Sequence, residues 1–269
     1  MTLTEEQIHR YARHIVLPEI GGKGQEKLLA AKVLLVGAGG LGSPVALYLA
    51  GAGVGTLGIM DGDTVSLSNL QRQIIHTTND IGRLKVDSAK DTIKQINPDV
   101  QVITYPEYAS VENILKIMAA YDVVIDCCDN FATRYLVNDA AVLLQKPFIY
   151  GSVMRFDGQA AFFYPPQGPC YRCLFPEAPP PGAVPTCQEA GIMGVLPGLI
   201  GMVQATEAIK FILGVGDLLL GRLLVYDALA MEFMHIQVGR NPECAICGDH
   251  PTITALHADN YPQLPCLTE

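Results

Sequence analysis

The sequence predicts an α/β fold with a doubly wound, mainly parallel sheet of the Rossmann type and an antiparallel C-terminal extension. A glycine-rich turn joins a strand-like run to a helical one, and strand and helix patterns then alternate as far as residue 151. Such alternation is typical of parallel sheets covered by helices. After residue 151 strand-like runs follow one another with few helices between them, which predicts the antiparallel part.

The individual elements follow from short apolar runs and their spacing. A strand at 32–36, a helix at 43–50 and a strand at 56–60 form a βαβ unit. Short helices are expected before it, from Thr4 onward and at 25–31. Further strands are expected at 100–104, 123–126, 148–151, 159–164, 223–227 and 233–238, and helices at 83–96, 111–120, 133–144 and within 192–213.

Length and composition predict one composite domain. The 269 residues are 49% hydrophobic and 17% charged, which is sufficient for a sizeable core. We divide the chain into N-terminal helices (1–31), a nucleotide-binding part (32–151), an antiparallel part with two cysteine pairs (152–248) and a tail (249–269). The net charge of −9 argues against nucleic acid as a partner.

The first residues lack a basic region followed by an apolar core, so we expect no signal peptide and a cytoplasmic location. The run 33–60 carries no charge and is long enough to span a membrane. Glycines and Pro44 divide it into strand, turn and helix, so we expect no membrane span.

The turn Gly37-Ala-Gly-Gly-Leu-Gly42 lies between the first expected strand and its helix. Glycines permit a tight turn and close approach of a phosphate, and a helix N-terminus favours anions. Asp61 ends the next strand, where a carboxylate typically binds ribose hydroxyls. We therefore assign Gly37, Gly39, Gly40, Gly42 and Asp61 to nucleotide binding; the alternative is a glycine-packed turn without a ligand.

Three charged residues indicate which nucleotide is bound. A nicotinamide enzyme needs only the turn and the acid, whereas Arg72 and Lys85 suit a triphosphate and a departing pyrophosphate. Asp129 follows the strand at 123–126 and is a candidate Mg²⁺ ligand. The same site is expected to include Ser68, Asn69, Gln73 and Asn130.

Two Cys-x-x-Cys pairs predict a structural zinc site. Cys170 and Cys173 form one pair, and Cys244 and Cys247 form the other. Two such pairs can supply four thiolates to one tetrahedral Zn²⁺, with no open position for catalysis. A redox dithiol is the alternative for either pair alone.

The other cysteines and the histidines carry weaker signals. Cys187 lies at the end of a proline-rich loop and is a candidate nucleophile, with an ordinary loop cysteine as the alternative. Cys127 and Cys128 end an apolar strand and are interpreted as packing residues. The histidines form no ligand cluster, and none is interpreted as catalytic.

The motifs together resemble the ThiF/MoeB/HesA adenylyltransferases, bacterial relatives of the ubiquitin-activating enzymes. The resemblance rests on the glycine turn, the run Ser-Leu-Ser-Asn-Leu-Gln-Arg-Gln at 66–73, Cys-Asp-Asn at 128–130 and the cysteine pairs. It implies an enzyme that uses ATP and Mg²⁺ to adenylate the Gly-Gly terminus of a ubiquitin-like sulfur carrier, releasing pyrophosphate. The carrier would serve molybdopterin or thiamine synthesis, and it would bind the antiparallel part.

The same resemblance implies roles for single residues. Gly40 would contact phosphate and Asp61 the ribose, while the phosphates would be held by Asn69, Arg72 and Lys85 and the magnesium by Asp129. Arg13 matches an arginine that crosses a homodimer interface into the partner's site.

Two further implications concern sulfur transfer. Cys187 matches a loop cysteine that links covalently to the carrier in some members of the family. Only 22 residues follow Cys247, so we expect sulfur from a separate cysteine desulfurase or sulfurtransferase. The remaining alternatives are an NAD-dependent oxidoreductase and a non-catalytic, zinc-stapled binder of a ubiquitin-like protein.

Overall fold

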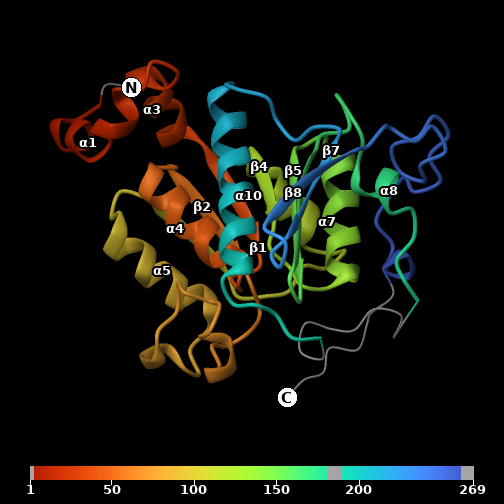
Figure 1. The fold of residues 1–269 in the computed structure, drawn as a ribbon, viewed down its shortest axis with the longest axis horizontal. Helices are drawn as coiled ribbons and strands as arrows, with labels where there is room; N and C mark the ends of the chain where they lie inside the picture. The colour runs from red at the N-terminus through yellow and green to blue at the C-terminus, as the bar shows by residue number, and fades with distance from the viewer. Residues whose placement is uncertain (1–2, 181–189, 262–269) are drawn as a thin grey trace.

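The structure is a computed structural model that describes residues 3–180 and 190–261. An eight-stranded mixed sheet lies at its centre, with helices on both faces (Figure 1). In spatial order the strands are β3 (Gln101–Tyr105), β2 (Thr56–Met60), β1 (Lys32–Val36), β4 (Val123–Asp126), β5 (Phe148–Met154), β6 (Asp157–Phe163), β7 (Arg222–Asp227) and β8 (Glu232–Gln237). The first five are parallel to one another, and the pairs β5–β6, β6–β7 and β7–β8 are antiparallel.

Two layers of helices cover this sheet. One face carries α3 (Gly21–Ala30), α4 (Gly42–Ala52), α5 (Lys85–Ile96) and α10 (Leu196–Leu213). The other carries α6 (Ile114–Ala119) and α7 (Phe131–Leu143), next to the short α8 (Tyr171–Leu174). The other helices that the structure describes in full are α1 (Glu5–Arg10), α2 (Ala12–Ile15) and the 3-10 turns η1 (Leu67–Asn69), η2 (Thr78–Asp80) and η3 (Ala258–Asn260). The predicted doubly wound sheet with an antiparallel extension is confirmed.

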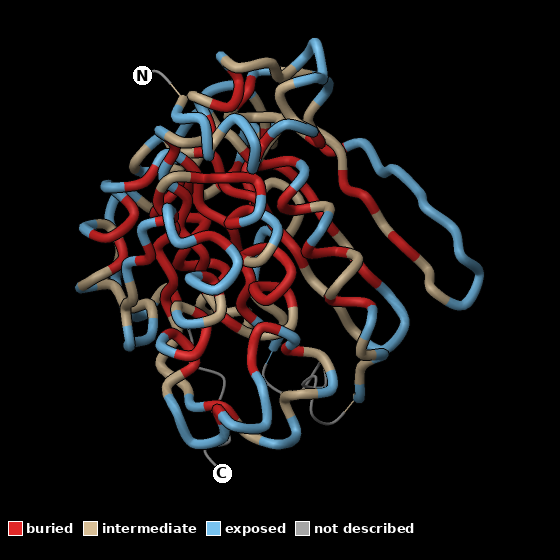
Figure 2. Tube along the Cα trace, turned by 90° about the vertical axis from the view of Figure 1, so that its left-hand side faces the viewer, coloured by how far each residue is buried: buried red, intermediate tan, exposed pale blue. Residues whose placement is uncertain are grey.

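The central strands show why the sequence predicted them well. In β1, Val33 and Leu35 pack on the α4 side, and Leu34 and Val36 pack on the α7 side. Successive side chains of a strand point to opposite faces, so a strand buried on both faces is apolar at every position. Buried residues accordingly gather in the middle of the molecule, while the outer strand of the β7–β8 hairpin is exposed throughout (Figure 2).

The apolar helix α10 belongs to the core. Among the described residues it is the one helix long and apolar enough to cross a membrane. Half of that stretch is buried in the protein, where α10 packs against α4, β5 and β6. Its buried Glu207 accepts a hydrogen bond from the backbone N–H of Leu219 at 2.6 Å, and it pairs with Lys210. These contacts are those of a core helix of a globular fold.

Several predicted boundaries need correction. β5 continues to Met154 rather than ending at residue 151, because residues 151–154 pair with β6. The division at 151/152 therefore falls inside a strand that both parts share. Three helices begin later than predicted, α5 at Lys85, α6 at Ile114 and α10 at Leu196. The first expected helix is interrupted at Tyr11, so α1 and α2 are separate.

Candidate nucleotide site and cysteine cluster

The glycine turn lies at the point where the sheet changes winding direction. The chain proceeds from β1 to β2 and β3 on one side, then returns to β4 and β5 on the other. Ligands of open α/β sheets bind at the carboxyl ends of the strands beside this switch. The glycine turn follows β1, and the Cys128–Asn130 segment follows β4. The topology thus brings two separately predicted motifs to one crevice.

Two positions in the turn require glycine. Gly37 has a φ of +108°, and a Cβ there would lie 2.6 Å from the carbonyl oxygen of Cys127. A Cβ on Gly42 would lie 2.2 Å from the carbonyl oxygen of Gly37. Any larger residue at either position would displace backbone, so the sequence pattern is needed for the turn itself.

Asp61 holds the turn from the end of β2. One carboxylate oxygen accepts the backbone N–H of Ala38 at 2.8 Å, and the other accepts that of Asp63 at 2.9 Å. Burial raises the pKa of Asp61, while Lys85 and these two N–H groups lower it. Each oxygen keeps a further lone pair, so the carboxylate can also accept a ribose hydroxyl.

Lys85 is the first residue of α5 and is buried, as few lysines are. Its ammonium pairs with Asp63 at 2.6 Å, and the hydroxyl of Tyr108 donates to the other oxygen of Asp63. Burial raises the pKa of Asp63, but the hydrogen bonds from Lys85 and Tyr108 outweigh it and lower that pKa. Sequence reasoning missed Asp63 and Tyr108. The only indication in the sequence was that Asp63 lies two residues after Asp61, the residue assigned to the ribose.

Arg72 and Gln73 line the turn from the other side. A Cβ on Gly40 would lie 3.5 Å from Cγ of Arg72 and 3.0 Å from Cβ of Pro197, at the start of α10. The amide nitrogen of Gln73 would lie 3.4 Å from a Cβ on Gly39. The buried Oε1 of Gln73 has no hydrogen-bond partner among the described residues. An unpaired buried acceptor beside a glycine turn suits a site that is completed by a ligand.

The neighbouring residues of this segment serve local structure. The Arg72 guanidinium donates to the carbonyl oxygen of Ser68 at 3.1 Å. The Ser68 hydroxyl lies 3.0 Å from that of Ser66, and Asn69 accepts the backbone N–H of Ser66 at 3.4 Å. Arg72 and Gln73 are thus beside the turn, whereas Ser68 and Asn69 build the 3-10 turn that carries them.

The segment after β4 rests on a buried ion pair. The guanidinium of Arg134 pairs with Asp126 at 2.9 Å and donates to the carbonyl oxygen of Cys128 at 3.1 Å. Asn130 caps α7 by accepting the backbone N–H of Thr133 at 2.8 Å, and Asp129 is exposed. The sequence did not predict the pairing of Asp126 with Arg134. It shows only that Asp126 ends one predicted strand and that Arg134 lies within the next predicted helix.

The cysteines of this segment are packing residues, as predicted. Cys127 and Cys128 are both buried, and burial raises the pKa of each thiol well above its ordinary value. Cys187 lies outside the described residues.

Arg13 lies far from the glycine turn of its own chain. It is exposed on α2 and lines a small cavity of about 200 Å³ with His14 and Gly51, near the C-terminal end of α4. The glycine turn adjoins the N-terminal end of the same helix. An 11-residue helix is about 16 Å long. The structure therefore does not bring Arg13 together with Arg72 and Lys85.

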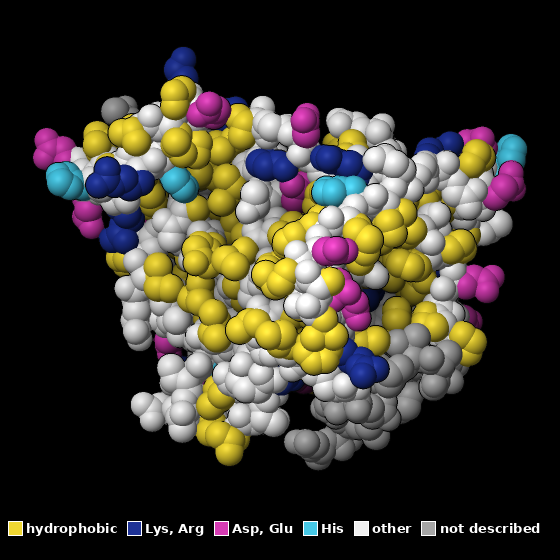
Figure 3. Space-filling view, in the orientation of Figure 1, with side chains coloured by type: hydrophobic (Ala, Val, Ile, Leu, Met, Phe, Trp, Pro, Cys, Tyr) yellow, Lys and Arg dark blue, Asp and Glu magenta, His cyan; other side chains and the backbone are white. Residues whose placement is uncertain are grey.

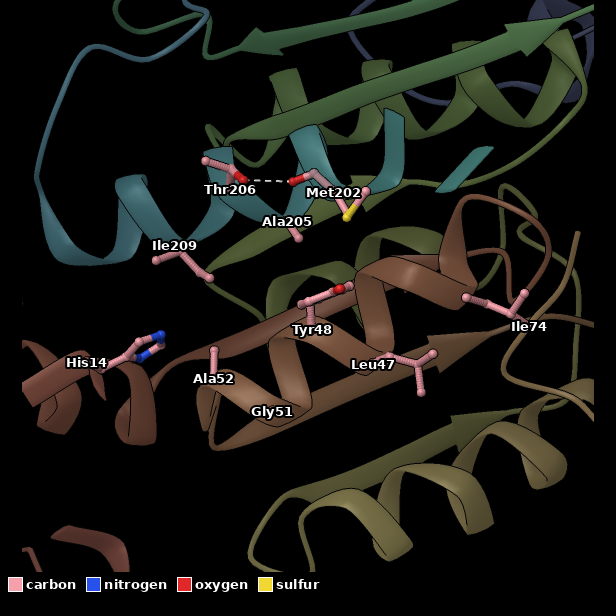
Figure 4. Close-up of a pocket in the computed structure, with 10 residues that line it drawn as sticks. All are labelled: His14, Leu47, Tyr48, Gly51, Ala52, Ile74, Met202, Ala205, Thr206 and Ile209. Carbon is pink, nitrogen blue, oxygen red and sulfur yellow. Dashed lines mark hydrogen bonds between the residues drawn. The ribbon is translucent and has the colours of Figure 1, made fainter. Parts of the chain in front are cut away.

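An apolar groove runs between α4 and α10 (Figure 4). It has a volume of about 680 Å³, and its residues include Leu47 and Tyr48 of α4 and Met202 and Ile209 of α10. His14 closes one end of it, beside the cavity that Arg13 lines. Hydrophobic side chains also gather on the outer surface over these helices (Figure 3). Soluble monomers rarely expose a continuous apolar area of this kind.

The two cysteine pairs meet at one point. The sulfurs of Cys170, Cys173, Cys244 and Cys247 lie within 4.8 Å of one another, with contacts of 3.3 to 3.9 Å. Zinc at 2.3 Å from four tetrahedral sulfurs would separate them by about 3.8 Å. The four thiols therefore fit a zinc ion.

A second buried ion pair fixes the first cysteine pair to α7. Arg172, between Cys170 and Cys173, binds Asp139 of α7 through two nitrogens at 2.8 Å. Asn138 accepts the backbone N–H of Tyr171 at 2.8 Å. The cysteine cluster is thus attached to a core helix.

Together these features define a class: a nucleotide-binding α/β domain with Arg72 and Lys85 near its topological switch point and a four-cysteine site that could hold zinc. The model of the ThiF family matches residues 11–246, so the chain belongs to this family. The family expected from the sequence motifs is thereby confirmed.

Relatives agree with this assignment. The chain is 52% identical over 257 residues to a "Sulfur carrier protein adenylyltransferase" of Thermus thermophilus, covering 94% of this chain and 95% of that protein. It is 47% identical over 249 residues to the "SAMP-activating enzyme E1" of Haloferax volcanii, covering 93% of this chain and 92% of that protein. A "Probable adenylyltransferase/sulfurtransferase MoeZ" of Mycobacterium tuberculosis is 50% identical over 244 residues; this covers 89% of the chain and 62% of MoeZ.

Solved structures share the fold. Escherichia coli MccB, in a structure described as containing ATP, superposes with a TM-score of 0.77 at 23% identity, covering 89% of this chain and 73% of that one. PaaA superposes with a TM-score of 0.75 at 25% identity, covering 89% and 76%.

Proposed function

We propose that this protein is an adenylyltransferase that uses ATP to activate the C-terminal Gly-Gly carboxylate of a ubiquitin-like sulfur carrier. The observation that carries the proposal is the position of Arg72 and Gln73 beside the glycine turn, with buried Lys85 close to Asp61, which holds that turn. A nicotinamide site does not need this triphosphate-binding set. The names of the relatives also favour adenylation over an oxidoreductase.

The reaction needs positioning and charge neutralisation more than proton transfer. A carboxylate oxygen of the carrier attacks the α-phosphorus of ATP, the bond from that phosphorus to the bridging oxygen breaks, and pyrophosphate leaves with the electron pair. Negative charge therefore develops on the leaving group. Arg72 and Lys85 would neutralise it, and Asp61 would hold the ribose in register.

Magnesium would be held by Asp129, beside the glycine turn. Its carboxylate is exposed, and no cation pairs with it in the part of the chain that the structure describes. A hard oxygen ligand of this kind fits Mg²⁺, which when bound supplies charge neutralisation at the phosphates. Zinc would be held by the four cysteines and would join the segment after β6 to the segment after β8.

We further propose that the enzyme is a homodimer joined through the groove between α4 and α10. Tyr48, Ile74 and Met202 are 59%, 61% and 41% exposed there, which suits a second copy. Arg13 is separated from its own glycine turn by about the length of α4. Its role in catalysis would therefore be in the partner's site, as the family resemblance implies.

The carrier is proposed to dock on the β7–β8 hairpin. Apolar side chains that are 49% to 74% exposed gather at this end of the sheet, namely Leu229, Met231, Phe233, Met234 and Ile236. A separate cytoplasmic sulfur donor, a cysteine desulfurase or sulfurtransferase, would then convert the adenylate to a thiocarboxylate for molybdopterin or thiamine synthesis. Cys187 remains a candidate for covalent attachment of the carrier.

ATP–pyrophosphate exchange tests the proposal directly. Exchange should depend on a small carrier that ends in Gly-Gly and should vanish when the terminal glycine is removed. Arg72→Ala should lower the exchange rate at least about a hundredfold, because it removes charge stabilisation of the leaving group. Exchange without a carrier would contradict the proposal. Carrier binding with no adenylate formed would favour a non-catalytic binder of the carrier. Preferential binding of NAD over ATP would favour an NAD-dependent oxidoreductase.

A further inference from the structure

His76 lies buried directly beneath the glycine turn, with only 5% of its surface exposed. Its Nε2 is 3.0 Å from the carbonyl oxygen of Ala38, and its Nδ1 is 2.8 Å from the hydroxyl oxygen of Ser88. The N–H of Ala38 donates to Asp61. Both backbone polar groups of Ala38, the second residue of the turn, are thus held, one by Asp61 and the other by His76.

The partners of the ring fix its tautomer. A carbonyl oxygen only accepts hydrogen bonds, so the contact with Ala38 requires a hydrogen on Nε2. In a neutral imidazole Nδ1 is then an acceptor for the Ser88 hydroxyl, which also hydrogen-bonds Asp80. With either partner of Ser88, the hydrogen on Nε2 stays on the Ala38 carbonyl.

The same contacts connect the turn to the helix that carries the phosphate-binding lysine. Ser88 is three residues after Lys85 on α5, which places both on neighbouring positions of one helix face. Thr92 of that helix also donates to the carbonyl oxygen of Ile75, next to His76, at 2.8 Å. The imidazole therefore bridges two elements that must be correctly spaced to bind one triphosphate.

We propose that His76 is a positioning residue for adenylation: it ties the Ala38 carbonyl to Ser88 of α5, and so sets the glycine turn relative to Lys85. The inference rests on the function proposed above, but it also makes a prediction for ATP binding alone. His76 does not touch the reacting atoms. It acts through the backbone of the turn.

The charged groups near the ring act on its proton affinity. Burial lowers the pKa of His76; the hydrogen bond to Ala38 and the charge of Asp80 raise it, and the charge of Lys85 lowers it. Ser88 also hydrogen-bonds Asp80. If Nδ1 became a donor, the Ser88 hydroxyl could therefore accept from it and donate to Asp80. The contact with Ala38 is thus kept in either protonation state of the ring.

Two substitutions separate positioning from packing. In His76→Gln the amide NH₂ can still donate to the Ala38 carbonyl, whereas in His76→Phe no donor remains. ATP affinity measured by equilibrium dialysis at pH 8 should fall about tenfold or more in His76→Phe and stay within about threefold of wild type in His76→Gln. His9→Gln, on exposed α1, is the matched control and should leave ATP affinity unchanged.

The split between the two variants supplies the decisive readout. In pyrophosphate exchange, the KM for ATP should rise about tenfold in His76→Phe and stay within about threefold of wild type in His76→Gln, because only the donor to the Ala38 carbonyl differs. Normal ATP affinity in folded His76→Phe, or an equal loss of affinity in both variants, would overturn the inference. If His76→Phe does not fold, a loss of more than about threefold in His76→Gln would overturn it. Absent exchange in the wild type would refute adenylation, while the dialysis would still test His76.

Discussion

The buried ion pair between Asp139 and Arg172 predicts a large loss of stability when one partner is removed. Asp139 is fully buried and the Arg172 side chain is 9% exposed, with nitrogen to oxygen distances of 2.8 Å. The Arg172 guanidinium also lies 4.5 Å from the centre of the Tyr135 ring. Asp139→Leu would leave this guanidinium buried without its counter-ion, and such changes cost about 3–5 kcal/mol.

The expected size can be converted to a melting temperature. With an unfolding entropy of about 2.1 cal/mol/K per residue, 269 residues give about 2 °C for each kcal/mol, so Tm should fall by about 5–9 °C. Differential scanning calorimetry measures the change, and zinc analysis by mass spectrometry shows whether the Cys170–Cys173 segment still holds metal. We expect reduced zinc retention, because Arg172 lies between these two cysteines.

Two controls make the prediction specific. The double variant Asp139→Leu with Arg172→Met removes both charges and should melt above Asp139→Leu alone. Asp91→Leu removes an exposed partner of Arg83 and should cost about 0–1 kcal/mol. An Asp139→Leu protein within 1 kcal/mol of the wild type would refute the reasoning.

Three other predictions concern zinc, the dimer and acid stability. Cys173→Ser or a strong chelator should lower Tm and release about one zinc per chain, since structural zinc contributes to folding; an unchanged Tm would contradict a structural role. Mixing inactive Arg13→Ala and Arg72→Ala dimers under subunit exchange should restore about a quarter of wild-type activity, because half of the dimers then hold one intact site of two. No recovery after confirmed exchange would argue against action across the interface. Because burial lowers the pKa of His76 below its value of about 6.5 in the unfolded chain, the unfolded state binds more protons and stability should decline as pH falls below about 6.5. Urea unfolding at pH 7 and pH 5 measures this loss, which should be smaller in His76→Gln.

The sequence was most informative where burial alone decides residue type. The predicted bounds of β1, β2 and β4 agree with the structure, because these strands are buried on both faces. The cysteine pairs were equally predictable, since their spacing and residue type alone predict a cluster that could hold zinc, and the four sulfurs do meet.

Contacts between distant segments could not be predicted in the same way. Lys85 was assigned to phosphate, but its partner Asp63 became visible only when the loop after β2 met the start of α5. His76 was set aside with the other histidines, because nothing local shows that Ala38 and Ser88 flank its ring. The extension of β5 past Gly151 likewise depends on pairing with β6 rather than on local propensity.

The pairing of β5 with a strand on each side has a consequence for the length of the carrier's C-terminal tail. This strand hydrogen-bonds to β4 on the nucleotide side and to β6 on the carrier side, so no hinge separates the two regions. If the carrier docks on β7–β8 as proposed, the path from there to the glycine turn is a fixed span, and the carrier's extended tail would have to match it. Each extended residue covers about 3.3 Å, so one residue added or deleted before Gly-Gly would misplace the carboxylate by roughly that distance. The rigid sheet would then select carriers by tail length as well as by surface.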